Sequence, residues 1–212
     1  MTTKISIVYH TRTEHTGSLA QAVADGAQRV SGVQVNMYPL TASQLDKDGK
    51  WNDEPVMAAL DASDAIIFGC PTYMGSVSSV CKAFMEATLS VWASQGWKDK
   101  FAGGFTNSAT LSGDKLNSLV DLVVFAAQLG MIWVPIGDLP GAPGGSDGSL
   151  TLNRLGGYLG AMAQSDLGGD PASAPPEMDL DTGRRYGERV TQIARRFNGE
   201  GEYTTSRVPF GG

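Results

Sequence analysis

Residues 4–16, with the sequence KISIVYHTRTEHT, join an apolar run rich in β-branched residues to a turn rich in hydroxyl groups. A segment of helix-forming composition, 19–30, follows at once. A turn between a strand and a helix exposes backbone N–H groups and the positive end of the helix dipole at the carboxyl edge of a sheet. Thr11, Thr13 and Thr16 add hydroxyl donors. The stretch therefore predicts a cradle for one terminal phosphate group; the alternative is an N-capped helix without a ligand.

This turn lacks the two common glycine-rich phosphate motifs. It contains neither Gly-x-Gly-x-x-Gly nor Gly-Lys-Ser/Thr, so it implies neither a dinucleotide-binding loop nor a Walker loop. The ligand that fits is one with a single terminal phosphate, as a mononucleotide carries.

Short apolar runs alternate with helix-compatible segments along the chain. The runs lie at 5–9, 33–38, 65–69, 101–106 and 131–136, and the helical segments at about 17–30, 55–62, 77–92, 114–128 and 181–197. In the last segment one helical face carries Tyr186, Val190, Ile193 and Phe197. The alternation predicts an α/β fold, a doubly wound five-stranded parallel sheet with helices on both faces. Because the first strand feeds the ligand turn, we expect right-handed crossovers and the flavodoxin-like strand order 2-1-3-4-5.

Three segments interrupt this alternation. Residues 39–54 are polar and predict a surface excursion, whereas 137–178 form a connection of a length typical of a functional lid or of disorder. Apolar side chains within the second segment indicate that part of it packs: Leu150, Leu152, Leu155, Tyr158 and Leu159. We predict one domain over 1–198 and a C-terminal tail over 199–212, whose cluster at 208–210 either frays or reaches a neighbouring subunit.

The composition excludes several classes of function. A formal net charge of −6 argues against a nucleic-acid partner, and no apolar stretch reaches the roughly 20 residues of a membrane span. The N-terminal residues lead straight into a strand pattern, so we expect a cytoplasmic protein. Cys70 and Cys81 are expected to be buried free thiols, and His10 and His15 without a ligand cluster predict no metal site. The chemistry is thereby left to a cofactor.

Two further loops are expected beside the first, because ligands of doubly wound sheets bind beyond the carboxyl ends of the strands where the strand order reverses. In the loop 69–76, Pro71 and Gly75 shape the turn. Tyr73 and Met74 present an aromatic ring and a polarizable side chain on which a flat ring system could lie. The alternative is that they only cover a helix end.

The loop 106–113, TNSATLSG, is dense in small polar side chains. Such donors and acceptors would stabilise negative charge that develops on a reduced ring system. A plain structural role is also open: Ser112 could cap the next helix, with Asp114 near its dipole.

The chain resembles the WrbA-type NAD(P)H:quinone oxidoreductases, a family of flavodoxin-like FMN proteins. The resemblance extends from about Lys4 to Phe197 and is clearest in DAIIFGCPT at 64–72, VWAS at 91–94 and GMIWVPIG at 130–137. It implies FMN as cofactor and NADH or NADPH as electron donor. It further implies ping-pong transfer of two electrons to a small quinone-like acceptor by a homo-oligomer, a dimer or a tetramer.

The resemblance also implies the site residues. FMN would be held by three loops. The phosphate loop comprises Thr11, Arg12, Thr13, Glu14, His15 and Thr16, and the ring loop comprises Pro71, Thr72, Tyr73, Met74 and Gly75. The polar loop comprises Asn107, Ser108, Ala109, Thr110, Leu111 and Ser112. Acceptor or nicotinamide would contact Trp92, Gln128 and Thr13. No side chain is expected to act as catalytic acid or base, because the flavin carries the chemistry.

Three features depart from the family pattern. Glu14 stands where the family usually has Gly; a carboxylate facing a phosphate is unfavourable, so Glu14 is expected to point outward or to pair, with Arg12 as a candidate. Gln128 replaces a histidine, which keeps a hydrogen-bond donor but removes a group that titrates near neutral pH. The excursion before the third strand is also shorter than typical. Three alternatives stay open: a flavodoxin-type electron carrier, a reductase of nitro or azo aromatic acceptors, and a relative without cofactor.

Overall fold

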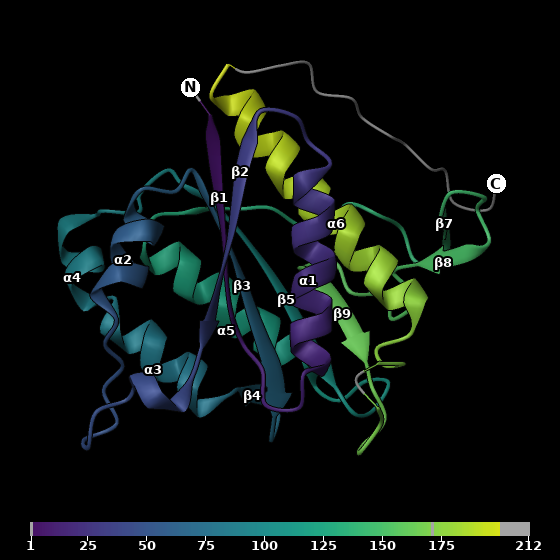
Figure 1. Ribbon diagram of the computed structural model, residues 1–212, viewed down its shortest axis with the longest axis horizontal. Helices are drawn as coiled ribbons and strands as arrows, with labels where there is room; N and C mark the ends of the chain where they lie inside the picture. The colour runs from purple at the N-terminus through teal and green to yellow at the C-terminus, as the bar shows by residue number, and fades with distance from the viewer. Residues whose placement is uncertain (1, 171, 200–212) are drawn as a thin grey trace.

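The main sheet of the protein is parallel and carries helices on both faces (Figure 1). The computed structural model describes residues 2–170 and 172–199. The strands run in the order β2-β1-β3-β5-β6, with every neighbouring pair parallel. In that order they span Val33–Leu40, Thr3–His10, Ala65–Tyr73, Phe101–Ser108 and Ile132–Trp133. The predicted α/β fold and the flavodoxin-like order of its five strands are confirmed.

The fifth strand position differs from the prediction, because two segments share it. The strand predicted at 131–136 is only β6, and Pro135, which has no N–H to donate, follows shortly after it. The free carboxyl half of β5 then pairs with β9 (Ala161–Gln164), also in parallel, through Phe105–Ser108. A short antiparallel strand, β4 (Ser76–Val77), extends β3 and completes the seven-stranded sheet.

Six α-helices are described, and none of the helices in the described ranges is long and apolar enough to cross a membrane. They are α1 (His15–Gln28), α2 (Glu54–Asp61), α3 (Ser79–Ala87), α4 (Leu89–Ser94), α5 (Lys115–Gln128) and α6 (Glu177–Phe197). The single helix predicted at 77–92 is wrong: it is divided at Thr88, whose hydroxyl donates to the Met85 carbonyl (2.7 Å). The helix predicted from 181 begins earlier, at Glu177.

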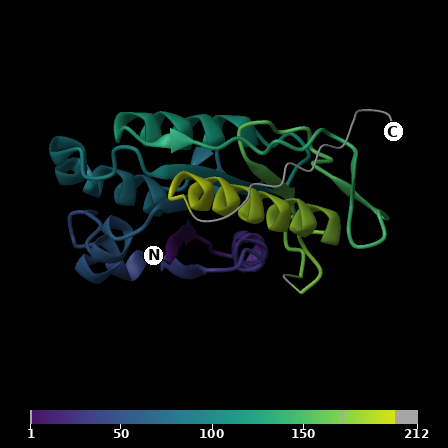
Figure 2. The same cartoon turned by 90° about the horizontal axis from the view of Figure 1, so that it is seen from above.

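The helices lie on both sides of the sheet (Figure 2), and two hydrophobic clusters, one on each face, hold these layers together. On one face α1 and α6 pack against the strands through Leu19, Val23, Tyr186 and Val190. The other face packs mainly against α3 and α5 and is aromatic: the Phe68 ring contacts those of Phe84, Trp97 and Phe125. Both faces of the central strands β1, β3 and β5 are therefore buried, as their near-continuous apolar runs predicted.

The two long connections carry more structure than their composition predicted. In 39–54, a 3₁₀ turn (Ala42–Gln44) precedes Trp51, which is buried and meets the Phe84 ring edge-on at 5.1 Å. In 137–178, β7 (Ala142–Gly144) and β8 (Leu150–Leu152) form a hairpin before β9 returns to the sheet. Leu152 is fully buried, which agrees with the expectation that part of this connection packs. The tail predicted over 199–212 lies outside the described residues apart from Gly199.

Replacing Tyr186 by phenylalanine is expected to destabilise the fold by about 1–3 kcal/mol. The buried Tyr186 hydroxyl donates to the Val134 carbonyl (2.7 Å) and accepts from the Gly104 N–H (3.0 Å). Its loss therefore leaves these two backbone groups without that hydrogen-bond partner. Urea denaturation followed by circular dichroism measures the change. Tyr158→Phe, at a ring that is 59% exposed, is the control and should change the free energy of unfolding by less than about 0.5 kcal/mol. Equal effects of the two substitutions would contradict this role.

Candidate functional site

The strand register brings the three predicted loops to one edge of the sheet. Tyr9 pairs with Gly69 and Pro71 pairs with Asn107, so β1, β3 and β5 end side by side. The loops that follow these strands, 11–14, 74–75 and 109–114, are therefore neighbours. The strand order reverses between β1 and β3, which is where doubly wound sheets bind their ligands.

A fourth segment, which the sequence reasoning missed, joins this edge. β9 ends beside Ser108, and the residues after it contact two of the predicted loops. Ser165 Oγ donates to Asn107 Oδ1 (3.0 Å), and the Gly169 carbonyl accepts from His15 Nε2 (2.9 Å). The only signal in the sequence is the short apolar run at 161–163 inside the long connection.

The phosphate loop leaves several donors without partners. Glu14 is the N-cap residue of α1, and its side chain makes no capping hydrogen bond. Thr11 Oγ1 is buried and has no hydrogen-bond partner in the described structure. Buried hydroxyls and first-turn N–H groups are normally satisfied, so this arrangement fits an oxygen-rich anion at the start of α1.

Glu14 is an exposed residue at the start of α1. Its φ angle of 62° is left-handed, a conformation that costs a non-glycine residue about 1–2 kcal/mol. A Cβ atom built on Gly17 would lie 2.7 Å from Glu14 Oε2, so the carboxylate rests against the first turn of α1. Glu14 is exposed, which agrees with the expectation that it points outward, and among the described ion pairs there is none between Glu14 and Arg12.

The ring loop is a tight hairpin between β3 and β4. Met74 and Gly75 form its turn, both with positive φ, and the Met74 side chain is fully exposed. Tyr73 is 40% exposed and meets the His10 ring edge-on at 6.5 Å. The Thr72 hydroxyl points the other way, into the fold, where it lies 2.8 Å from both Thr106 Oγ1 and Ser118 Oγ. Tyr73 and Met74 thus offer the apolar surface of this loop.

A buried polar chain supports the ring loop from beneath. His10 Nδ1 lies 2.8 Å from Ser78 Oγ, and the Ser78 N–H donates to Cys70 Sγ at 3.1 Å. Burial, helped by the charge of Arg12, lowers the pKa of His10, so its ring is neutral at pH 7. Cys70 and Cys81 are both buried and free, as predicted.

The polar loop is held by a residue that the sequence analysis did not single out. Lys115, the first residue of α5, is fully buried and donates to Ser108 Oγ (2.8 Å) and to the Thr110 carbonyl (2.6 Å). Asn107 and Ser108 are buried, whereas Leu111 and Ser112 are exposed at the rim. Nothing in a single sequence marks a lysine after a polar loop as buried, because most lysines lie at the surface.

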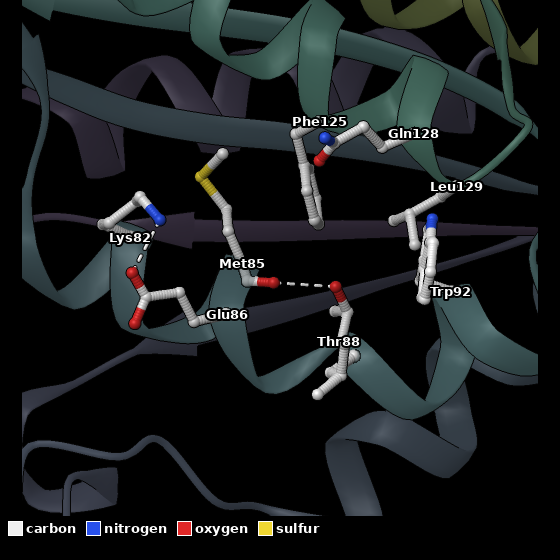
Figure 3. A pocket seen from close by; sticks show the side chains of 9 residues that line it. Lys82, Met85, Glu86, Thr88, Trp92, Phe125, Gln128 and Leu129 are labelled. Carbon is white, nitrogen blue, oxygen red and sulfur yellow. Dashed lines mark hydrogen bonds and ion pairs between the residues drawn. The ribbon is translucent and has the colours of Figure 1, made fainter.

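Trp92 and Gln128 lie together but away from the three loops. They line a pocket of about 420 Å³ between α3, α4 and the end of α5, with Lys82, Met85, Glu86, Thr88, Leu89, Phe125 and Leu129 (Figure 3). Gln128 ends α5, close to where Gly130 accepts from the Asp99 N–H at the amino end of β5. Since α5 rises about 1.5 Å per residue, this pocket is roughly 20 Å from the polar loop of the same chain.

These features define a class of protein. A parallel sheet in this order, with an unpartnered buried hydroxyl before α1, an apolar hairpin and a polar loop at its switch point, is a flavodoxin-like fold whose edge suits a mononucleotide with a flat ring. Within the described ranges, no three His, Cys, Asp or Glu side chains gather as metal ligands.

Comparison with known proteins agrees with this class. Residues 9–140 match the family model described as NADPH-dependent FMN reductase. Flavodoxin FldP of Pseudomonas aeruginosa is 39% identical over 196 residues, which cover 92% of this chain and 98% of its own. A Geobacter sulfurreducens protein named NAD(P)H dehydrogenase (quinone) is 31% identical over 207 residues, covering 92% and 99%. The crystal structure of a flavodoxin, WrbA-like protein from Agrobacterium tumefaciens matches with a TM-score of 0.66 at 40% identity, covering 92% and 98%.

The chain therefore belongs to the NADPH-dependent FMN reductase family, among its flavodoxin-like, WrbA-type members. The predicted family is confirmed, and the family indicates FMN as the cofactor and an oxidoreductase as the general function.

Proposed function

We propose that this chain is an FMN-dependent oxidoreductase that transfers two electrons from NADH or NADPH to a quinone-like acceptor. The observation that carries the proposal is the open hairpin of Tyr73 and Met74 beside two polar loops. An apolar surface that borders solvent lets a small flat molecule reach a ring bound at the same edge. The family match and the name of the Geobacter relative support an enzyme of this kind.

The three loops divide the cofactor between them in this proposal. Residues 11–16 hold the phosphate through N–H and hydroxyl donors, 71–75 flank the ring, and 107–112 bind its polar edge. FMN, when bound, supplies the two-electron chemistry. The chain orients it and leaves one face open, so nicotinamide and acceptor use that face in turn, in a ping-pong order.

Trp92 and Gln128 act in the acceptor site only across a subunit boundary. Their pocket lies at the far end of α5 from the polar loop of the same chain. In a homo-oligomer, a dimer or a tetramer, α4 of one subunit approaches the ring loop of another. Trp92, with its ring 55% exposed, is the side chain that such a contact would cover.

A one-electron carrier is the second candidate, because the Pseudomonas relative of similar length bears the name flavodoxin. The exposed apolar side chains Met74, Leu111 and Leu167, two in the site loops and one after β9, would suit a protein partner at this rim. A reductase for a nitro or azo aromatic acceptor would use the same open face as a quinone reductase.

Anaerobic stopped-flow reduction of the FMN-loaded protein by NADH and by NADPH tests the proposal. Reduction followed by rapid reoxidation with benzoquinone is the expected result, and a panel with nitro and azo aromatics identifies the preferred acceptor. A protein that binds FMN but turns over with neither nicotinamide nor quinone is a carrier. A colourless protein that ignores added FMN would refute both candidates.

Trp92→Ala is expected to lower the rate of acceptor reduction at least about tenfold while FMN stays bound, because the variant removes a stacking surface from the acceptor pocket only. Steady-state turnover with benzoquinone and the ratio of flavin to protein absorbance are the two measurements. Phe197→Ala, at a ring that is 66% exposed at the end of α6, is the control. Loss of FMN before loss of turnover would show that Trp92 has another role.

A further inference from the structure

Lys115 is a buried cation directly behind the polar loop. Its side chain is fully buried, and its Nζ donates to Ser108 Oγ at 2.8 Å and to the Thr110 carbonyl at 2.6 Å. Both acceptors belong to the loop proposed to bind the polar edge of FMN. These hydrogen bonds and the burial of the side chain thus fix the position of the ammonium group behind this loop.

The Lys115 charge has no carboxylate of its own. Asp179, the acid whose charge acts on Lys115, already accepts two hydrogen bonds from Arg154 (2.7 and 2.8 Å) and one from the Gln164 N–H (2.9 Å). Among the carboxylates of 2–170 and 172–199, none lies within 4.0 Å of Lys115 Nζ. Burial lowers the Lys115 pKa to about 8, so the group is still charged at pH 7.

A buried charge without a counter-ion favours any negative charge that develops nearby. The field of a cation is screened far less inside the protein than at its surface. Oxidised FMN has a neutral ring system, and hydride transfer from a nicotinamide adds two electrons and one proton, which leaves the ring with one negative charge. The nicotinamide becomes the oxidised cation in the same step.

We propose that Lys115 favours the reduced, anionic state of bound FMN over the oxidised state and so raises its two-electron reduction potential. The inference rests on the proposed function, and it deepens it, because a higher potential suits a protein that accepts hydride from a nicotinamide. Lys115 acts through space and through the loop, without touching substrate, so it is a positioning residue.

The test compares variants that separate charge from loop support. Lys115→Gln keeps hydrogen-bond donors but removes the charge, Lys115→Met removes both, and Lys115→Arg keeps the charge. Lys100→Met is the matched control: Lys100 is half-buried and donates to the Asp61 and Ser63 carbonyls, but it lies before β5, at the opposite edge of the sheet. Circular dichroism and urea denaturation establish that each variant is folded.

The readout is the potential of bound FMN by spectroelectrochemical titration, with the dissociation constants of oxidised and reduced FMN. We expect Lys115→Gln to weaken binding of reduced relative to oxidised FMN about tenfold, a fall of about 30 mV for a two-electron couple. Lys115→Arg and Lys100→Met should keep the wild-type potential. A wild-type potential in Lys115→Gln, or equal weakening of both redox states in Lys115→Gln, would overturn the inference and leave a loop-holding lysine. Failure of the wild-type protein to bind FMN would instead refute the proposed function.

Discussion

Gly17→Ala is expected to weaken FMN binding by at least about 100-fold, or roughly 2.7 kcal/mol, while the chain stays folded. Gly17 lies in the first turn of α1, and an added Cβ would sit 3.4 Å from Thr11 Cγ2 and 2.7 Å from the present position of Glu14 Oε2. The flexible carboxylate can move aside, but the methyl group would then occupy the space proposed for the phosphate. Alanine also has the higher helix propensity, so the fold itself should not suffer.

Fluorescence titration with FMN and with riboflavin measures this effect, because riboflavin has the same ring but no phosphate. Gly17→Ala should weaken FMN binding and leave riboflavin binding unchanged. Glu14→Gln is the counterpart: without the carboxylate beside the first turn of α1, FMN should bind about tenfold more tightly, and riboflavin should bind as it does to the wild type. Parallel changes for both flavins in either variant would contradict a phosphate site at this turn.

Gly187→Ala is expected to destabilise the fold by about 3 kcal/mol or more. Gly187 is buried in α6 where this helix crosses α1, and an added Cβ would lie 2.0 Å from the Val23 carbonyl oxygen. The neighbour is backbone and cannot rotate away, so the two helices would have to separate. In an exposed helix the same substitution stabilises by about 1 kcal/mol, and the sign of the change therefore tests the contact.

Urea denaturation followed by circular dichroism gives the free energy of unfolding for this variant. Glu188→Ala, the next position along α6 and only half-buried, is the matched control and should change stability by less than about 0.5 kcal/mol. Because α1 begins at the phosphate loop, separation of the helices should also weaken FMN binding. A Gly187→Ala protein as stable as the wild type would show that α1 and α6 do not meet as described.

The strand order was predictable because local signals agreed. Each apolar run at 5–9, 65–69 and 101–106 lies within a strand of the sheet, buried on both faces as a parallel sheet requires. The turns at 11–14 and 74–75 fall within the loops predicted at 11–16 and 69–76, since glycine and threonine favour turns at strand ends.

Two of the errors concern contacts between segments that are distant in the sequence. β9 has four residues, and its place in the sheet depends on the open half of β5, more than 50 residues earlier in the sequence. Trp51 lies in a polar stretch, yet the Phe84 ring buries it. The sequence around β9 and the sequence around Trp51 do not indicate which segment each will contact. Hydrophobic burial is non-directional and depends on which surfaces meet.

The sequence by itself determined the α/β class, the order of the five strands and the three loops at one edge, because periodicity and turn chemistry act over a few residues. Only the tertiary structure decided the position and the burial of the side chains around that edge. It placed the Glu14 carboxylate beside the first turn of α1, buried Lys115 behind the polar loop, and placed Trp92 and Gln128 together far from both. Burial, charge environment and distance belong to the packed chain, since each depends on residues that are remote in sequence.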